Sequence, residues 1–526
     1  MVSYLTSAFL GLLRDRLLAG RFGAGEELDV YYAAFTIPDL IALLFIFGAI
    51  SAAIVPIFSS YWVKSKDQAW QYLGNLFNIF LTFLIVVCVI LIIVAPFIVS
   101  FIAPGFSAGK RADTILLMRI IFLSPILLGI SNIISGILQV FHRFLVTALA
   151  PVMYNLGIIA GILFFVPFFG LSGLAFGVVL GGLLHLLIQV HTLFYSGFKY
   201  QNIFNIHHPG VLKTLKLMAP RSLGLGAGQL NTVVITAIAS TLSAGSIAVF
   251  NLANNLSSLL VNAVALSLST AVFPAMSLAY SKEDKKDFEK KFSKAFLQML
   301  FLVIPLCFLI FILRAQIVRV VLGVGKFGWS DTRLTAACLG VFSLGLFAQG
   351  LIFLLSKTFY AAHNTKIPAL ISIVTVIFNI IISFLFVWAL GSFGFLHKLL
   401  DYLLKLEGVR DIRIIGLALA FSITAIAEVS LLLFFLYKKL KSFRLKELSQ
   451  SLYKILISSV VMAVITLLVR QVLVQYHIIS LQTFLGVFLQ LVISGLAGAI
   501  TYIFTSYLLK SSELKAIKEF FFRWII

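Results

Sequence analysis

About fourteen apolar runs, each long enough to cross a lipid bilayer, set the strongest limit on how this 526-residue chain folds. A composition of 61% hydrophobic and 11% charged residues excludes an ordinary soluble globular protein. Backbone polar groups in lipid must be satisfied within the protein, so runs of this length predict helices. We therefore expect an all-α polytopic membrane protein with about 14 transmembrane helices. The expected spans are roughly 3–21, 30–58, 74–101, 115–140, 147–168, 171–195, 218–241, 246–277, 293–313, 334–360, 367–391, 413–437, 453–475 and 482–508.

The net charge of +21 does not indicate a nucleic-acid-binding protein, because the basic residues lie singly or in short clusters between apolar runs. If the N-terminus is cytoplasmic, the loops on that side hold about twice as many Lys and Arg residues as the opposite loops. The positive-inside rule therefore predicts that both termini are cytoplasmic. The three cysteines lie in apolar segments without Cys/His spacing, so neither a disulfide framework nor a metal site is indicated. The N-terminus also lacks the pattern of a removable signal peptide.

Two loops carry helical signals of their own. Residues 281–296, SKEDKKDFEKKFSKAF, predict a solvated helix with a serine N-cap that leads into the next span. Residues 392–412 have apolar side chains at helical spacing, which predicts an amphipathic external helix lying on the membrane.

The chain also repeats itself at an offset of roughly 220 residues. Residues 22–59 resemble 242–277, with an Ala-Gly turn and a late proline in register, and 142–189 recur as 363–432. Both halves start on the same side, so we expect parallel repeats related by an axis along the membrane normal. The expected parts are 1–200 (N-terminal lobe, helices 1–6), 201–440 (C-terminal lobe, helices 7–12) and 441–526 (helices 13 and 14 and a cytoplasmic tail).

The first span contains charges, Arg14, Asp15 and Arg16, within otherwise apolar sequence. An ionisable side chain at bilayer depth costs about 2.5–3.5 kcal/mol on insertion scales and usually marks a substrate or ion path. Arginine suits phosphate because its planar fork binds two oxygens and stays charged. We expect Arg14 to bind an anionic group and Asp15 to pair with Arg16 or Arg21. The alternative is that the arginines extend to the membrane interface.

Several segments together resemble the MurJ (MviN) lipid II flippase family, which belongs to the multidrug/oligosaccharidyl-lipid/polysaccharide exporter superfamily. They are LGLLRDRLLAGRFGAGEELDVYYAAFTIPDL ending at Leu40, APGF at Ala103–Phe106, HRFLVTALAPVMYNLG at His142–Gly157, MAP at Met218–Pro220, GKF around Lys326 and FYAAHNTKIP at Phe359–Pro368. The resemblance covers nearly the whole chain and implies two six-helix lobes plus two further helices, in agreement with the repeat.

The resemblance implies a transporter, not an enzyme. It would move the undecaprenyl-diphosphate-linked peptidoglycan precursor, lipid II, from the inner to the outer leaflet by alternating access, for cell-wall synthesis and cell shape. The implied location is the bacterial cytoplasmic (inner) membrane, as a multi-pass protein. Its partners would be the lipid-linked oligosaccharide, membrane lipids and cell-wall synthesis proteins.

The family pattern can be followed residue by residue. Arg14 and Asp15 match its Arg-Asp pair, Arg21 matches the segment before its GAG turn, and Asp29 matches the acid that starts its second helix. The chain departs from the family where arginines often stand, with Ala8 and Ala42, and where an acid–arginine pair is replaced by Asn254 and Asn255. A divergent member with a less cationic cavity is therefore expected.

Other polar residues in the spans are candidate sites. Asn254 and Asn255 would bond phosphate or sugar, or else join helices. Arg221 would draw in anionic head groups, or else anchor its span at the interface. Asp39, after Pro38, marks a hinge or a cavity lining.

In the second half, Glu428 would form a site for a coupling ion, Na+ or H+, with Asn379, Ser422 and Thr424; no other cofactor is expected. Some family members are thought to couple transport to sodium or to the membrane potential through this lobe. The alternative is a protonated glutamate bonded to a neighbouring helix.

Rival functions remain open at this stage. Within the superfamily they are a flippase for another polyprenyl-linked glycan and a multidrug exporter, although an exporter is expected to lack the two appended helices. From another class they are a membrane-embedded glycan polymerase and a degenerate member acting as a scaffold. A polymerase would need an acidic or metal-binding motif in an external loop, and those loops contain only scattered acids.

Overall fold

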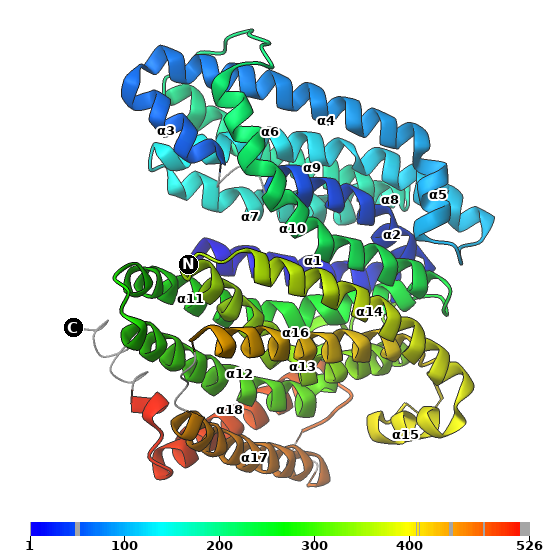
Figure 1. The fold of residues 1–526 in the computed structure, drawn as a ribbon. Coiled ribbons are helices and arrows are strands. Elements are labelled where there is room, and N and C mark those ends of the chain that lie inside the picture. The colour runs from blue at the N-terminus through cyan, green and yellow to red at the C-terminus, as the bar shows by residue number, and fades with distance from the viewer. Residues whose placement is uncertain are drawn as a thin grey trace. The chain divides into compact units, whose positions relative to one another are not determined.

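The computed structural model describes residues 2–47, 53–406, 408–409, 411–440, 445–476 and 479–515. The regular elements in these ranges are all helices, as expected (Figure 1). They are α1 (Val2–Phe22), α2 (Glu26–Ile41), η1 (Ala42–Phe47), α3 (Val55–Lys64), α4 (Lys66–Ile102), α5 (Ala108–Ile121), α6 (Leu123–Val140), α7 (Phe144–Ala160), η3 (Gly161–Phe165), α8 (Val166–Phe169), α9 (Ser172–Tyr195), α10 (Pro209–Ser240), α11 (Ser246–Ser281), α12 (Lys285–Leu322), α13 (Trp329–Ala361), α14 (Lys366–Ser392), α15 (Gly394–Leu404), α16 (Ile414–Leu440), α17 (Leu445–Gln475) and α18 (Phe484–Leu508).

Each expected span coincides with one or more of these helices. Among the described residues, eleven helices are long and apolar enough to cross a membrane. The other three expected spans correspond to α1, to α10 and to the segment from α2 to α3. Several spans contain a change of helix type, and the second one passes from α-helix to π-helix at Ala42, shortly after Pro38. Such changes are common where proline removes a backbone hydrogen bond.

The helices form two compact units, residues 1–248 and 249–526. In the first unit α9 packs against α6 and α7, α1 packs against α7, and α2 packs against α5. Helix α10, which the repeat assigns to the second lobe, belongs to the first unit because it packs on α2, η1 and α4.

Side chains at the start of α10 attach it to α4. Tyr72 and Thr214 share a buried hydrogen bond of 2.7 Å between their hydroxyl groups. His208 caps the helix by accepting a hydrogen bond from the Gly210 N–H, and it lies beside the rings of Tyr61 and Tyr72. Burial lowers the pKa of His208, which favours the neutral imidazole that this cap requires.

A seam of glycines lets α7 and η3 approach α9 closely. A Cβ atom on Gly157 would lie 2.3 Å from the Gly181 Cα atom, and one on Gly161 would lie 2.4 Å from the Gly177 Cα atom. Small residues at four-residue spacing are the usual way for membrane helices to bring their backbones together. The first unit therefore depends on these glycines for its packing.

We predict that Gly177→Ala destabilises the protein by about 1–3 kcal/mol, because the new methyl group would overlap the Gly161 backbone. The thermal unfolding midpoint in detergent measures the effect. Gly109→Ala is the matched control, since a Cβ atom there meets nothing within 4 Å. Equal midpoints for the two variants would contradict the close packing of this seam.

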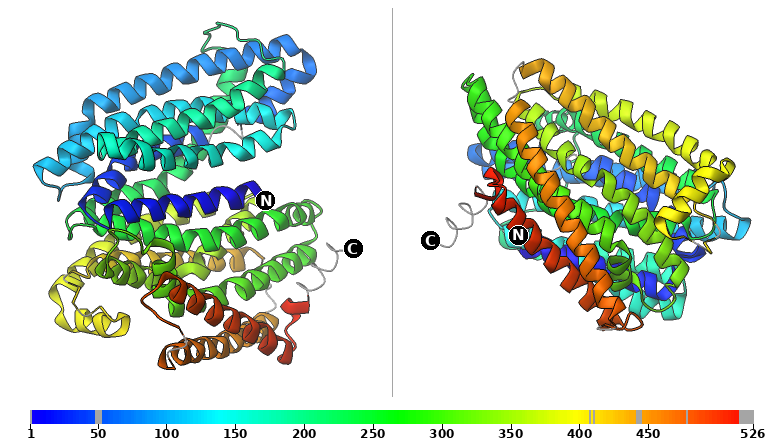
Figure 2. Two further views of the ribbon diagram at one scale, coloured as in Figure 1. Left: turned by 180° about the vertical axis from the view of Figure 1, so that it is seen from behind. Right: turned by 90° about the horizontal axis from the view of Figure 1, so that it is seen from below.

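In the second unit, α13 is the most enclosed of the described spans, because 72% of an apolar 18-residue stretch of this helix is buried. Helices α12 and α16 both pack against α13, and α14 packs against α16. The appended helices α17 and α18 pack against each other and against α12 (Figure 2). The second unit thus contains the appended pair as an integral part.

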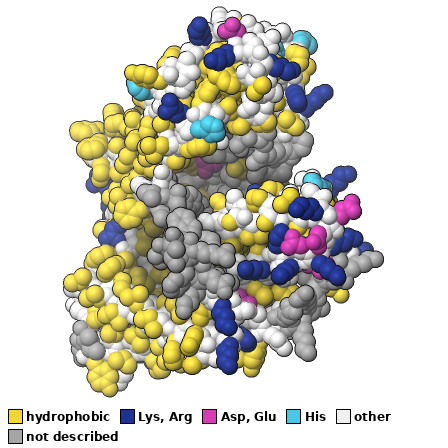
Figure 3. Space-filling model, turned by 90° about the vertical axis from the view of Figure 1, so that its left-hand side faces the viewer, with side chains coloured by type: hydrophobic (Ala, Val, Ile, Leu, Met, Phe, Trp, Pro, Cys, Tyr) yellow, Lys and Arg dark blue, Asp and Glu magenta, His cyan; other side chains and the backbone are white. Residues whose placement is uncertain are grey.

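The two loop helices expected from the sequence are present. α15 exposes large apolar side chains, with Phe395 at 80% and Tyr402 at 81%. The cap predicted at Ser281 is wrong, since α11 continues to that residue. Asp284 caps α12 instead by accepting a 2.9 Å hydrogen bond from the Asp287 N–H, after Glu283 turns the chain with a positive φ. Charged side chains, most of them Lys and Arg, gather on the face shown in Figure 3.

Candidate functional site

The charged cluster of α1 lies where the helix packs against α7. The Arg14 guanidinium donates to the Asp15 Oδ1 atom from both Nε, at 3.0 Å, and Nη2, at 2.9 Å. The Asp15 side chain is 5% exposed and the Arg14 side chain 25% exposed. Asp15 was expected to pair with Arg16 or Arg21, whereas Arg14, its neighbour in the sequence, is a partner here.

An asparagine on a neighbouring helix also contacts Arg14. Asn155, on α7, accepts a 3.4 Å hydrogen bond from the Arg14 Nη1 atom through its Oδ1 atom. Its amide nitrogen donates to the Ser7 hydroxyl and to the Pro151 carbonyl group. Asn155 thus orients the Arg14 fork from the opposite helix. Sequence reasoning did not select this residue, although an asparagine within an apolar run was a signal that could have found it.

Aromatic and acidic side chains of α2 surround the pair. Tyr31, Tyr32 and Asp39 all interact electrostatically with Arg14. The Tyr32 hydroxyl is buried and makes no hydrogen bond within the described chain. The Asp39 side chain is exposed. Arg14 is therefore near two carboxylates, one of which it pairs with, and near a buried tyrosine hydroxyl that makes no hydrogen bond within the described chain.

Asp29 has a structural role that the sequence analysis did not anticipate. Its side chain is buried, and its two carboxylate oxygens accept hydrogen bonds from the Gly245 N–H at 2.6 Å and the Ala248 N–H at 2.9 Å. These amides lie at the N-terminus of α11, where backbone N–H groups lack partners in their own helix and favour negative charge. A Cβ atom on Gly245, whose φ is +89°, would lie 1.8 Å from the Ala24 carbonyl oxygen. The two repeat-related turns therefore contact each other directly.

We predict that Asp29→Asn lowers the free energy of unfolding by about 2 kcal/mol or more, because an amide offers one acceptor oxygen where two N–H groups need one each. Thermal unfolding in detergent is the measurement. Glu26→Gln in the same turn is the control, since its ion pair with Lys110 is exposed and contributes little. An unchanged midpoint with lost transport would instead assign Asp29 to the substrate.

The remaining predicted residues fall in different places. Arg21 is exposed in the last turn of α1. Asn254 and Asn255 are half-buried on α11, and the Asn254 carbonyl group accepts a hydrogen bond from the Ser257 hydroxyl. The side chain of Arg221 lies outside the described residues.

A second polar cluster joins α14 and α16 in the second unit. The Glu428 carboxylate accepts hydrogen bonds from the Ser372 hydroxyl at 2.9 Å and the Thr375 hydroxyl at 3.3 Å. One turn along α16, Thr424 accepts a 3.1 Å hydrogen bond from the buried Asn379 amide. The hydroxyl of Ser422, which was also expected in this cluster, donates to the Val341 carbonyl group on α13. The cluster presents oxygen atoms of the kind that hard cations prefer.

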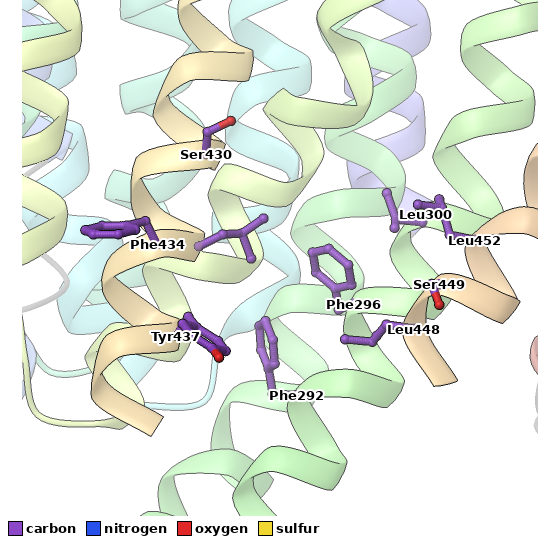
Figure 4. A pocket seen from close by; sticks show the side chains of 10 residues that line it. Phe292, Phe296, Leu300, Ser430, Phe434, Tyr437, Leu448, Ser449 and Leu452 are labelled. Atoms are coloured by element: carbon purple, nitrogen blue, oxygen red, sulfur yellow. The ribbon is translucent and has the colours of Figure 1, made fainter. Parts of the chain in front are cut away.

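A pocket of about 480 Å³ lies between α12, α16 and α17. Phe292 and Phe296 project into it from α12, opposite Phe434 and Tyr437 on α16 (Figure 4). Its lining is apolar except for two serines and the Tyr437 hydroxyl. Such a surface accepts a hydrocarbon chain and excludes a charged head group.

Comparison with known proteins decides the family. A family model described as "Lipid II flippase MurJ" matches residues 18–397. The chain belongs to the MurJ family. A probable lipid II flippase MurJ of Buchnera aphidicola subsp. Acyrthosiphon pisum is 29% identical over 506 residues, which cover 95% of this chain and 94% of that protein. The lipid II flippase MurJ of Burkholderia cenocepacia is 28% identical over 399 residues, which cover 74% and 77% of the two chains.

Solved structures agree with membership of the MurJ family. Lipid II flippase MurJ in an inward closed conformation matches with a TM-score of 0.78 at 27% identity, over 96% of this chain and 97% of that one. An inward-facing multidrug resistance MATE family transporter of the MOP superfamily matches with a TM-score of 0.67 at 17% identity, over 83% and 95%. The second likeness extends to the fold alone.

Proposed function

We propose that the protein is a flippase that carries lipid II from the inner to the outer leaflet of the bacterial cytoplasmic membrane by alternating access. It is a multi-pass membrane protein of the MurJ family, and the named members of that family with which it shares most of its length are lipid II flippases. The observation that most supports a substrate-binding site is the half-buried guanidinium of Arg14 within the first span.

The chemistry of Arg14 suits a diphosphate. In the resting protein Asp15 neutralises the guanidinium, so the empty site holds no uncompensated charge. Asn155 accepts a hydrogen bond from the Nη1 atom of Arg14. A diphosphate carries more negative charge than the Asp15 carboxylate, which it would displace from the guanidinium. Phosphate capture then rests mainly on the first unit. A multidrug exporter lacks a comparable need for a phosphate-binding fork.

We predict that Arg14→Ala reduces lipid II translocation by about tenfold or more, because one charge-assisted bidentate contact is lost. Growth of a MurJ-depleted bacterium and exposure of lipid II on its outer leaflet provide the measurement. Arg14→Lys should restore part of the activity, since it keeps the charge without the planar fork. Arg21→Ala is the control because that side chain is exposed. Full rescue by Arg14→Ala would reject the phosphate site.

Orientation and partners belong to the same proposal. The basic loops, including the segment before α12, support cytoplasmic termini. The source of lipid II and the use of the flipped product imply contact with cell-wall synthesis proteins on the two sides of the membrane.

We further propose that the cluster around Glu428 couples transport to Na+ or H+. The carboxylate accepts two hydroxyl hydrogen bonds, and the hydroxyl oxygens keep lone pairs for a cation. Asn379 and Thr424 extend the oxygen-lined path by one helical turn.

We predict that Glu428→Gln abolishes the dependence of lipid II transport on an imposed cation gradient, because the variant cannot hold a charge at that position. Liposomes containing the purified full chain, with a sodium gradient in one arm and a pH gradient in the other, distinguish the two ions. Glu283→Gln, on the exposed turn before α12, is the control. A gradient dependence that survives in Glu428→Gln would reject this site.

A further inference from the structure

Two arginines from different helices meet in the second unit without an acidic partner. Arg314 on α12 donates its Nη1 to the Phe311 carbonyl group at 2.7 Å. Arg470 on α17 donates its Nη1 to the neighbouring Ile312 carbonyl group, also at 2.7 Å. Since the two accepting carbonyl groups belong to adjacent residues, both guanidinium groups lie at the same turn of α12. No Asp or Glu within the described ranges forms a salt bridge with either one.

Each guanidinium group keeps most of its donors. Of the five N–H groups of each, one is used by a carbonyl oxygen within the described chain. Both arginine residues are partly exposed, so they also reach the surface. Arginines that merely reached for water would extend away from each other, whereas these two converge on one turn of α12. A single anion with several oxygen atoms could accept hydrogen bonds from both guanidinium groups.

The surroundings hold both side chains in place. The Arg314 guanidinium lies 4.9 Å from the centre of the Phe311 ring, and α13 approaches its stem at Gly340, where a Cβ atom would be 2.7 Å from the Arg314 Cδ atom. On the other side, buried Gln490 of α18 donates to the Arg470 carbonyl group and accepts from Gln316. The Arg314 side chain is therefore confined by α12 and α13, and the Arg470 backbone is fixed by α18.

Both arginines lie near the C-terminal ends of α12 and α17, close to residues of the kind found at the membrane–water interface. Trp329 is exposed between Arg319 and Arg333, with cation–π distances of 5.6 and 5.4 Å, an arrangement typical of the membrane–water interface. Arg314 precedes Arg319 by five residues, which places it about 7.5 Å deeper along α12. Arg470 lies the same number of residues before the end of α17 at Gln475.

Apolar side chains continue inward from the pair. Ile312, Leu313 and Ala463 form a buried cluster between α12 and α17, and further hydrophobic residues pack around it: Phe308, Leu309, Ile317, Leu467 and Leu491. A head group on the arginines would leave its hydrocarbon chain beside exposed apolar side chains of the same two helices, Phe311, Val464 and Leu468. A free anion has no hydrocarbon chain that could contact these side chains.

We propose that Arg314 and Arg470 together bind the phosphate group of an anionic membrane lipid, in the leaflet opposite the basic segment that precedes α12. In the proposed orientation this is the outer leaflet. The site lies within one unit and is independent of the Arg14 site, so it does not depend on lipid II being the transported substrate. It attaches the appended helices α17 and α18 to α12 through a lipid.

The test measures lipids retained by the full chain in native mass spectrometry after purification with phosphatidylglycerol, a polyprenyl monophosphate, diacylglycerol or inorganic phosphate. We expect retention of a phosphate-bearing lipid but not of diacylglycerol. Arg314→Gln with Arg470→Gln should weaken that retention about tenfold or more. Whichever phosphate lipid is retained identifies the source, and retention of inorganic phosphate alone would overturn the role of the lipid.

Control variants separate binding from folding. Arg319→Gln removes a nearby cation on the same helix and should leave lipid retention unchanged. If the double Gln variant does not fold, Arg314→Lys with Arg470→Lys keeps both charges without the forks and should show intermediate retention. Equal retention of phosphatidylglycerol by wild type and the substituted protein, or equal retention of phosphatidylglycerol and diacylglycerol, would overturn the proposal.

Discussion

The ion pair between Arg14 and Asp15 is the interaction on which the first unit depends. Each charge alone would cost about 2.5–3.5 kcal/mol at bilayer depth on insertion scales, and pairing at 2.9 Å reduces that cost before any substrate arrives. The pair also explains why polar groups of other helices turn toward α1. Asn155 holds the guanidinium from α7, and Tyr32 brings a hydroxyl group that has no partner within the described chain.

A second constraint acts at the helix ends. A span that begins inside a packed bundle leaves several backbone N–H groups without partners, and Asp29 supplies both carboxylate oxygens to the start of α11. The contact joins two turns that the sequence repeat relates to each other. It is possible because Gly245 has no side chain where the Ala24 carbonyl group approaches. One copy of the duplicated turn thus packs directly against the other copy.

The sequence predicted the helices well and the partners poorly, for physical reasons. Hydropathy over about 20 residues is a local property, so the positions of the spans follow from composition alone. The partner of Asp15, the cap provided by Asp284 and the bond from Ser422 to Val341 depend on where a side chain meets another segment. Hydropathy does not predict such contacts between segments. Asn155 and Arg470 show that a lone polar residue in an apolar run is a usable signal, because burial in lipid requires a partner for it.

The most direct test of this account uses purified protein in liposomes that hold lipid II in one leaflet, with its appearance in the other leaflet measured over time. Wild type should translocate lipid II, and a folded Arg14→Gln, Asp15→Asn double variant, which keeps the site neutral but removes the fork, should not. Translocation by the double variant at the wild-type rate would contradict the central role of Arg14, and absence of translocation by wild type would contradict the flippase assignment.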